Sequence, residues 1–368
     1  MFGKLGFTAF GGPAAHVAMM EDEVVRRRGW LSRERFLDMF GATNLIPGPN
    51  STEMAIHIGY DRRGAAGLLV AGACFILPAV AIVTAIAWIY VRYGALPEVT
   101  GVMRGIKPVI IAVVIQALWG LGKTAVKTPF LGVVAAGAFA ANLAGINELV
   151  VLAAAGLVVA LGRIRIRPAA SLLPWPLLGA GATATATTTA TAFGLWPLFL
   201  FFLKVGSVLF GSGYVLLAFL RSDLVEHFHW LTESQLLDAI AVGQITPGPV
   251  FTTATFIGYL LGGAPGAGVA TVGIFLPAFV FVAISGPLVP RLRRSQLAGA
   301  ILDGVNVASL ALMAVVTLEL GRTAIVDVPT ALLAAASAVV LIRWRPNSAW
   351  LVLAGAIIGA ILATFPLG

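Results

Sequence analysis

Two kinds of glycine- and proline-rich motif each occur twice in the chain, and their residue types suit the binding of an anion. One is Phe10-Gly11-Gly12-Pro13, with its counterpart Phe210-Gly211-Ser212-Gly213, and the other is Pro47-Gly48-Pro49, with its counterpart Pro247-Gly248-Pro249. Proline and glycine interrupt a helix, and Ser, Thr and Asn favour the start of a new one. Each new start presents free amide donors and the positive end of a helix dipole, which together favour an anion.

The candidate ligands of such an anion lie in or just after the interruptions. They are Gly11, Gly12, Pro47, Gly48, Asn50, Ser51, Thr52, Gly211, Ser212, Gly213, Gly248, Thr252 and Thr253. A helix terminus contributes about 0.3 to 2 kcal/mol, whereas moving an ion into a medium of low dielectric costs on the order of tens of kcal/mol. A cation must therefore help. Lys4 and Lys204 each stand six residues before a Phe-Gly pair, and we weigh ligand contact equally against snorkelling to an aqueous interface.

Three titratable residues near the interruptions could carry a proton. Glu53 and His57 are spaced i and i+4 on the helix predicted after Pro49, where the second copy has Thr253 and Ile257. A carboxylate and an imidazole on one buried face could move a coupling proton, or they could be a satisfied polar pair. His16 is the third candidate, with helix packing as its alternative. No second His or Cys lies near His57 to complete a ligand set, so no metal site and no cofactor is predicted.

The chain that carries these motifs is strongly apolar. Of its 368 residues, 59% are hydrophobic and 11% are charged, and the mean hydropathy is +0.96. Stretches long enough to cross a bilayer hold no Asp, Glu, Lys or Arg, namely 64–91, 168–203, 239–290 and 346–368. This composition excludes a soluble enzyme and predicts a polytopic membrane protein. The net charge of +8 comes from clusters between apolar runs, which set topology and do not indicate nucleic acid, and the single Cys74 excludes an internal disulfide.

The chain contains an internal duplication. At a shift of about 200 positions Trp30-Leu31 matches Trp230-Leu231, and after one deletion Leu77-Pro78-Ala79 matches Leu276-Pro277-Ala278. The matching positions are Gly, Pro, Trp, Lys and Asp, so general apolar similarity does not explain them. We predict a first repeat, a connecting transmembrane segment with a linker, and a second repeat over residues 1–165, 166–198 and 199–368.

The positive charges favour a particular path through the membrane. If the four interrupted segments return as re-entrant hairpins and nine uninterrupted segments cross, 17 of the 24 Lys and Arg residues fall on one side, and full crossing of the interrupted segments removes this bias. Five crossings then separate the repeats, which makes them inverted. The predicted fold is an all-α polytopic membrane protein with two inverted-topology repeats, each with two interrupted re-entrant helical hairpins followed by spanning helices. The crossings are predicted at 66–91, 105–122, 128–146, 148–162, 170–195, 264–289, 300–319, 323–342 and 347–366.

Several blocks of the sequence closely resemble the two-domain, or long-chain, chromate ion transporters. They include FGGPAAHVAMMEDEVVRRRGWLSRERFLD, LIPGPNSTEMAIHIGYDRRGAAGLLVAGACFILPA and the second-half block that begins FGSGYVLLAFLRSDLVEHFHW. The resemblance implies chromate efflux across the bacterial inner membrane, driven by membrane potential, a proton gradient or sulfate counter-transport. The family pattern Phe-Gly-Gly-Gly is here Phe210-Gly211-Ser212-Gly213, which adds a hydroxyl.

Substrate and class leave alternatives open. Chromate and sulfate are tetrahedral dianions of similar size, which amides and hydroxyls separate only weakly, so a carrier of sulfate or another oxyanion is the second interpretation. An oxyanion channel would use the same site. A hydrolase would need Glu53, His57 and Ser51, but the sequence has no nucleophile–base motif and no enzyme is predicted. The expected partners are the oxyanion, a coupling proton and the lipid bilayer, without nucleic acid and with a homodimer left open.

Overall fold

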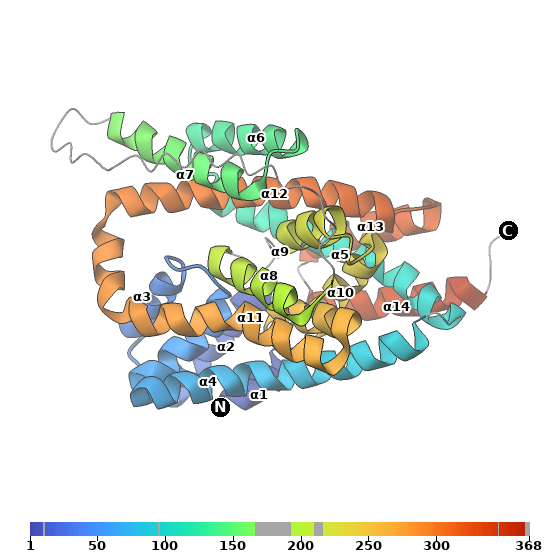
Figure 1. Cartoon of the computed structure of the whole chain (residues 1–368), viewed down its shortest axis with the longest axis horizontal. Helices are drawn as coiled ribbons and strands as arrows, with labels where there is room; N and C mark the ends of the chain where they lie inside the picture. The colour runs from blue at the N-terminus through green and yellow to red at the C-terminus, as the bar shows by residue number, and fades with distance from the viewer. Residues whose placement is uncertain (10–11, 95, 166–192, 210–215, 345, 365–368) are drawn as a thin grey trace.

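The computed structural model describes residues 1–9, 12–94, 96–165, 193–209, 216–344 and 346–364. Throughout these ranges the regular structure is helical (Figure 1). The first half contains α1 (Phe2–Thr8), α2 (Gly12–Glu21), the π-helix η1 (Asp22–Arg27), α3 (Arg33–Thr43), α4 (Asn50–Tyr93), α5 (Pro97–Ala125), α6 (Pro129–Leu143) and α7 (Glu148–Arg165). The second half contains α8 (Leu195–Val208), α9 (Leu216–Phe219), the π-helix η2 (Leu220–His227), α10 (Glu233–Ile245), the 3₁₀-helix η3 (Val250–Thr252), α11 (Thr253–Arg294), α12 (Gln296–Ala324), α13 (Val328–Trp344) and α14 (Ser348–Thr364).

Hydroxyl caps fix where the helices before the Pro-Gly-Pro motifs begin. The Ser32 side chain accepts a hydrogen bond from the Arg35 amide at the start of α3. At the start of α10 the Thr232 side chain accepts a hydrogen bond from the Gln235 backbone amide, and the Gln235 side chain accepts one from the Thr232 backbone amide. These are capping arrangements that a Ser or Thr before a polar first turn predicts. They stand 200 positions apart, so the two halves start equivalent helices at equivalent places.

α4 and α11 each consist of two arms joined by a sharp reversal. The backbone leaves helical geometry at Arg63 and Gly64 in α4, and at Gly262 and Gly263 in α11. A Cβ on Gly59 would collide with the carbonyl of Gly67, although residues eight apart in a straight helix lie about 12 Å apart. The chain therefore turns back, and we call residues 50–62 the short arm and residues 65–93 the long arm of α4.

The corresponding reversal in α11 rests on the same residue type. A Cβ on Gly258 would collide with the carbonyl of Gly266, so the two arms of α11 touch as closely as those of α4. Gly64 and Gly263 have φ of +57° and +61°, a left-handed conformation that favours glycine. Both reversals thus follow from glycines that the sequence repeats at a constant spacing.

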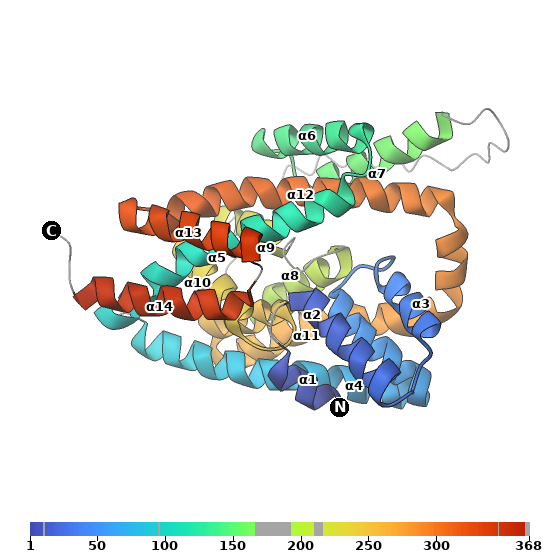
Figure 2. The same cartoon turned by 180° about the vertical axis from the view of Figure 1, so that it is seen from behind.

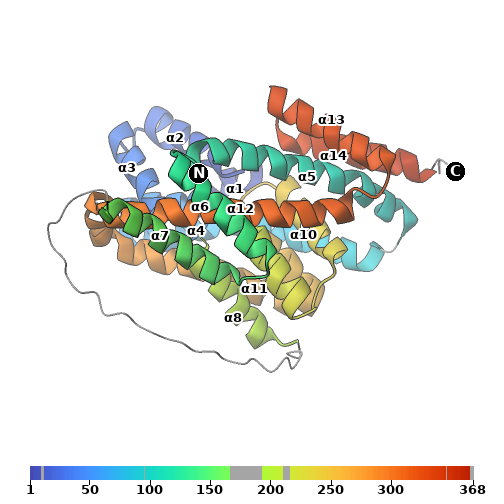
Figure 3. The ribbon, with the colours of Figure 1, turned by 90° about the horizontal axis from the view of Figure 1, so that it is seen from above.

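The halves of the chain interlock instead of packing as separate bodies. α4 packs on α11 and α5 packs on α12, while α13 and α14 pack on α5 and, reciprocally, α6 and α7 pack on α12 (Figures 1 to 3). Glycines allow the closest approaches, because Gly105 faces Gly355 and Gly359, and Gly304 faces Ala155. This reciprocity is what an approximate two-fold relation between the halves requires.

The fold is that of an all-helical membrane protein, as the sequence predicts. In the described ranges four helices are long and apolar enough to cross a bilayer, namely Asn50–Tyr93, Val99–Ala125, Val250–Ser285 and Gln296–Ala324. Shorter apolar helices are Pro129–Leu143, Leu195–Val208, Val328–Trp344 and Ser348–Ala363. Most of the crossing predicted at 170–195 lies outside the described residues. The count of nine crossings and the re-entrant path through a bilayer stay predictions.

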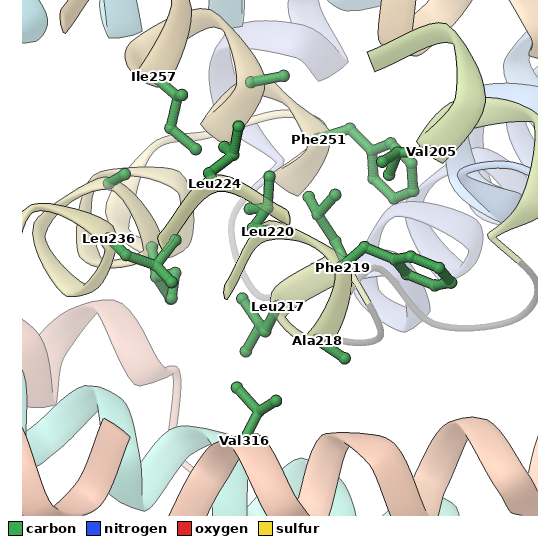
Figure 4. Close-up of a cluster of buried hydrophobic side chains, with 14 of the residues drawn as sticks. Val205, Leu217, Ala218, Phe219, Leu220, Leu224, Leu236, Phe251, Ile257 and Val316 are labelled. Carbon is green, nitrogen blue, oxygen red and sulfur yellow. The ribbon is translucent and has the colours of Figure 1, made fainter. Parts of the chain in front are cut away.

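A large apolar core lies around the second Pro-Gly-Pro loop. Figure 4 shows side chains from α8, α9, η2, α10, η3, α11 and α12 converging there, among them Leu217, Leu220 and Phe251. Leu220 is fully buried and Phe251 is 1% exposed. This core fixes η2 and α10 against α12, and so fixes the position of the loop that follows α10.

Candidate functional site

Each Pro-Gly-Pro loop is joined to the opposite half of the chain by a backbone hydrogen bond. The Gly48 amide donates to the carbonyl of Leu209 at 2.7 Å, and the Gly248 amide donates to the carbonyl of Ala9 at 3.0 Å. Leu209 and Ala9 are the residues immediately before the Phe-Gly interruptions of the two halves. Each Pro-Gly-Pro loop therefore binds the opposite half, next to the residue that precedes that half's Phe-Gly motif, and a substrate site shared by the two loops stays a prediction.

Only glycine fits at the centre of either Pro-Gly-Pro loop. Gly48 has φ of +138° and Gly248 has φ of +95°, which strain any L side chain. A Cβ on Gly48 would strike the Glu53 carboxylate, and one on Gly248 would lie 2.7 Å from the Cβ of Ala79. The neighbour of Gly48 on the other half is Ala278, the counterpart of Ala79. The two loops thus sit in equivalent positions against the long arms of α4 and α11.

The helix starts after the loops keep backbone donors available. The amides of Thr52 and Glu53 donate to the Pro49 carbonyl at 2.8 and 3.0 Å. The amides of Asn50 and Ser51 reach no backbone acceptor among the residues described. In the second half the Thr252 amide likewise donates to the Pro249 carbonyl at 3.0 Å. Open first-turn amides are the donors that an anion site at a helix start requires.

The side chains of the predicted ligands differ in their existing bonds. Thr252 and Thr253 donate their hydroxyl hydrogens to the carbonyls of Pro249 and Val250, each at 2.8 Å. The Thr52 hydroxyl is buried and has no partner within the described ranges. The Asn50 amide group donates to Asn44 Oδ1 at 2.8 Å. Thr52 is therefore the hydroxyl that is free to bind a guest without breaking a bond.

His16 joins the first interruption to the start of the short arm. Its side chain is 1% exposed, with Nε2 3.0 Å from the Ala9 carbonyl and Nδ1 3.2 Å from the Ser51 hydroxyl. Both contacts are satisfied when Nε2–H donates to Ala9 and Ser51 donates to Nδ1, which is the neutral imidazole. The ring also packs edge-on against Phe75. These contacts give His16 a positioning role at the point where Gly248 also binds Ala9.

Glu53 and His57 are buried on the short arm of α4, and the described residues offer no hydrogen-bond partner to the Glu53 carboxylate or to His57 Nε2. Glu53 is fully buried, and neither carboxylate oxygen has a hydrogen-bond partner in the described part of the chain. His57 is 8% exposed and its Nε2 has no partner there either. The alternative of a satisfied polar pair therefore finds no hydrogen bond between described residues to support it. Buried polar groups are normally bonded, so each exception needs an explanation.

The two candidate lysines lie at the surface of the molecule. Lys204 Nζ is 2.7 Å from Asp223 Oδ2, and its side chain is 41% exposed. Lys4 is exposed on α1. In the first half, the charge of Lys4 acts on Glu23. The pKa of Glu23 is lowered mainly by the hydrogen bond from Arg28 and to a smaller extent by the charge of Lys4. Lys204 is thus paired with an acid of η2, the charge of Lys4 acts on an acid of η1, and the contact of either lysine with a substrate stays a prediction.

Some predicted ligands fall beyond what can be described. Gly11, Gly211, Ser212 and Gly213 lie outside the described residues, and Gly12 is the first residue of α2. Pro47 is half-buried in the loop beside Gly48. Near the Phe-Gly motifs, the described contacts to the Pro-Gly-Pro loops are therefore those of the Ala9 and Leu209 carbonyls, which precede the motifs.

A buried ion pair that the sequence analysis does not predict lies on the helix before the second Pro-Gly-Pro loop. Lys107 Nζ is 3.0 Å from Asp238 Oδ1, and the Tyr90 hydroxyl donates to Asp238 Oδ2 at 2.7 Å. Lys107 also donates to Ser234 at 2.6 Å. The cluster joins α4, α5 and α10. Its signal in the sequence is an acid repeated inside an apolar helix, in Leu37-Asp38 and Leu237-Asp238.

Comparison with known proteins gives a consistent result over both halves. The family model described as chromate transporter matches residues 1–160 and 196–360. The "Chromate transport protein" of Cupriavidus metallidurans is 32% identical over 100% of this chain and 92% of its own length. The "Probable chromate transport protein" of Synechococcus elongatus is 32% identical over 90% of this chain and 86% of its own, and the "Chromate transport protein" of Pseudomonas aeruginosa is 30% identical over 89% and 82%. No solved structure matches the chain significantly.

Proposed function

Because the chain belongs to the chromate transporter family, we propose that it is a secondary active transporter that exports chromate across the bacterial inner membrane and so confers chromate resistance. The observation that supports this proposal is the reciprocal bonding of Gly48 to Leu209 and of Gly248 to Ala9, by which each Pro-Gly-Pro loop contacts the opposite half. Interrupted helices that meet between related halves are the usual construction of a substrate site in such carriers.

The proposed substrate site consists mainly of backbone donors. The open amides of Asn50 and Ser51 and the free hydroxyl of Thr52 bind the oxygens of a tetrahedral dianion from the first half. The start of η3, with Thr252 and Thr253, binds it from the second half. Helix dipoles at both starts add to these hydrogen bonds. Lys4 and Lys204 stay candidates for the balancing positive charge, and Lys204 would have to leave Asp223, with which it is paired, to reach the oxyanion.

Alternating access follows from the interlocked halves. In the proposed arrangement, residues 1–165 and 199–368 are inverted repeats, and 166–198 connects them across the membrane. Rocking of one set of packed helices against the other opens the shared centre to one side at a time. Glu53 is the proposed coupling group, because a buried carboxylate without a partner is far more stable in its protonated, neutral form. Proton uptake and release at Glu53 would then accompany each substrate movement.

Transport by the purified protein tests the proposal. Liposomes containing it should accumulate chromate under imposed pH and potential gradients and should exchange labelled chromate across the bilayer. If sulfate is transported at the same rate and bound with the same affinity as chromate, the alternative of a general oxyanion carrier is favoured. The proposed site is compatible with that alternative, because its donors bind only the oxygen atoms of the anion. Single-channel currents without labelled exchange would favour a channel. Neither uptake nor exchange of any tetrahedral oxyanion would contradict the function.

Labelling from each side tests the inverted arrangement. In a Cys74→Ser background, a cysteine at Gly64 and a cysteine at Gly262 should react with an impermeant maleimide from opposite sides of the membrane. Both positions lie at the reversals of α4 and α11, where the arms meet. Reaction of both from one side would contradict inversion without affecting the oxyanion site.

A further inference from the structure

Three titratable side chains follow one another along a single face of the short arm of α4. Glu53, His57 and Asp61 are spaced i, i+4 and i+8, which places each one helical turn beyond the last. Their exposure increases in the same order, from 0% for Glu53 and 8% for His57 to 29% for the Asp61 side chain. The row therefore leads from the buried centre, beside Gly48, to the surface of the molecule.

The outer end of this row is held at one defined end of the bundle. Arg35, in the first turn of α3, lies 3.1 Å from Asp61 Oδ1, and Arg62 packs on the ring of Trp30. The short arm thus ends beside the loop that carries the arginine cluster 26–28. By the positive-inside rule this is the cytoplasmic face. The inner end of the row, in contrast, is the Glu53 carboxylate with both oxygens unpartnered among the described residues.

The elements packed on the short arm add few charges to it. From α2 the titratable group is His16, which is already bonded to Ala9 and Ser51. α3 carries Arg33, Glu34, Arg35 and Asp38, of which Arg33 binds Glu21 and Arg35 binds Asp61. The long arm of α4 and α11 pack on Ile56 through apolar side chains, namely Leu68, Ala278, Phe279 and Val282. On the short arm itself, His57 is therefore the one imidazole or carboxylate side chain between Glu53 and Asp61.

The second half has no equivalent row. Its residues at the corresponding turns are Thr252 and Thr253, then Phe256 and Ile257, then Leu260 and Leu261. None of these is a carboxylate or an imidazole, and Phe256 and Ile257 are fully buried. If both inverted halves carried such a row, one row would lead to each side of the membrane. Because only the first half carries it, the row leads to one side.

We propose that Glu53, His57 and Asp61 form a one-sided proton path, by which Glu53 exchanges its proton only with the aqueous face at which Arg35 and Asp61 meet. The proton leaves a Glu53 oxygen for Nε2 of His57, and the proton on Nδ1 of His57 leaves to water at the Asp61 carboxylate, so the imidazole ends neutral. The reverse sequence reloads Glu53. This proposal rests on the proposed function, since it names the route of the coupling proton for the same site.

Chemical labelling of Glu53 in sealed vesicles tests the direction without requiring transport. Dicyclohexylcarbodiimide adds to a protonated carboxyl in an apolar environment, with its carbon bonding to the carboxyl oxygen and a nitrogen taking the proton. Right-side-out and inverted vesicles receive an acid jump on the outside only, and the Glu53 peptide is quantified by mass spectrometry. Labelling should rise promptly only where the Arg35–Asp61 face is outside. A rise in the opposite orientation, an equal rise in both, or no labelling at acidic pH would overturn the path.

Two variants test the individual steps. His57→Gln should slow the labelling response by at least about tenfold, in the range typical of a lost proton-transfer group. Asp61→Asn should slow it less, and Asp22→Asn is the matched control, because Asp22 is an acid at the same end of the bundle paired with Arg27 at 2.8 Å but outside the row. An unchanged response in His57→Gln would overturn the route. Retained chromate exchange shows that the variants fold. If Glu53 is labelled as expected but the protein exchanges no oxyanion, the proposed function is rejected and the proton path is still supported.

Discussion

At three matched positions near the interruptions, the first half has polar side chains where the second half has apolar ones. The counterparts are His16 and Leu216, Ser51 and Phe251, and His57 and Ile257. All six are buried, so the difference lies in chemistry and not in depth. In the second half these positions belong to one continuous apolar cluster (Figure 4). Duplication has thus preserved the backbone geometry of the two halves, while the imidazoles at these three positions occur only in the first half.

Two matched ion pairs also keep their geometry while their chemistry changes, because the acid and the base are exchanged between the halves. Glu21 contacts Arg33 at 3.4 Å in the first half, and Arg221 contacts Glu233 at 2.8 Å at the positions 200 residues later. The contact is preserved, although each charge is exchanged for its opposite. Arg221 additionally contacts Glu226 and Glu319, so the second pair lies in an acidic surrounding. Geometry is therefore the property that the repeat preserves most faithfully.

Substitution of the loop glycines is the strongest way to break the equivalence of the halves. Gly48→Leu and Gly248→Leu should each reduce chromate uptake by about a hundredfold or more, because both add strain at positive φ and displace the helix starts from the site. Uptake per amount of protein in the membrane measures the effect. Gly29→Ala is the control, since its φ is +58° and a Cβ there meets nothing within 4 Å. Full activity of either loop variant would refute a shared centre.

The ion pair before the second loop tests whether the polar residues of the second half serve structure. Asp238→Asn leaves Lys107 buried without its charge partner, which should lower the free energy of unfolding by about 3 to 5 kcal/mol. Asp223→Asn, which removes the partner of the exposed Lys204, should cost less than about 1 kcal/mol. Denaturant unfolding in detergent measures both. The double variant Lys107→Met with Asp238→Asn should recover part of the loss, and equal effects of the two single variants would contradict this assignment.

Much of the fold could be predicted from the sequence because glycine and proline positions repeat at a constant spacing. The helical class follows from composition, and the reversals at Gly64 and Gly263, which the sequence analysis did not name, occur at glycines that the duplication repeats. The partners of Gly48 and Gly248 could not be predicted, because the acceptors are backbone carbonyls of Leu209 and Ala9, which leave no side-chain signal. The Lys107–Asp238 pair was missed for a related reason, since it joins α5 and α10 across 131 positions of sequence. The sequence shows that a charged residue lies in an apolar helix, but it does not show which other helix supplies the partner of that charge.

Glu53 sharpens the comparison because the second half has only hydroxyls at the same turn. Glu53→Gln should retain labelled chromate exchange, since the amide is uncharged and nearly the same shape, but should lose the acceleration of net transport by a pH gradient. Glu53→Asp should recover part of that acceleration, because it restores a titrating group. The measurement is chromate flux with a pH-sensitive dye inside the liposomes. Proton-coupled accumulation by Glu53→Gln at the normal rate would show that the coupling group lies elsewhere.

The reversed ion pairs give the smallest expected effect and the most direct test of how far geometry outlasts chemistry. Glu21→Arg alone places a like charge beside Arg33, but the Arg33 side chain is 74% exposed, so water screens the pair and the cost should stay below about 1 kcal/mol. Combining it with Arg33→Glu reproduces the arrangement of the second half and should restore the original stability. Thermal unfolding in detergent, read as a double-mutant cycle, measures the coupling between the two positions. Arg221→Gln is the contrasting variant and should cost more, because the Arg221 side chain is only 14% exposed and its loss leaves Glu226, Glu233 and Glu319 facing one another. If the exchanged first-half pair proved less stable than either single variant, the surrounding arginines and not the pair itself would determine which sign each position holds.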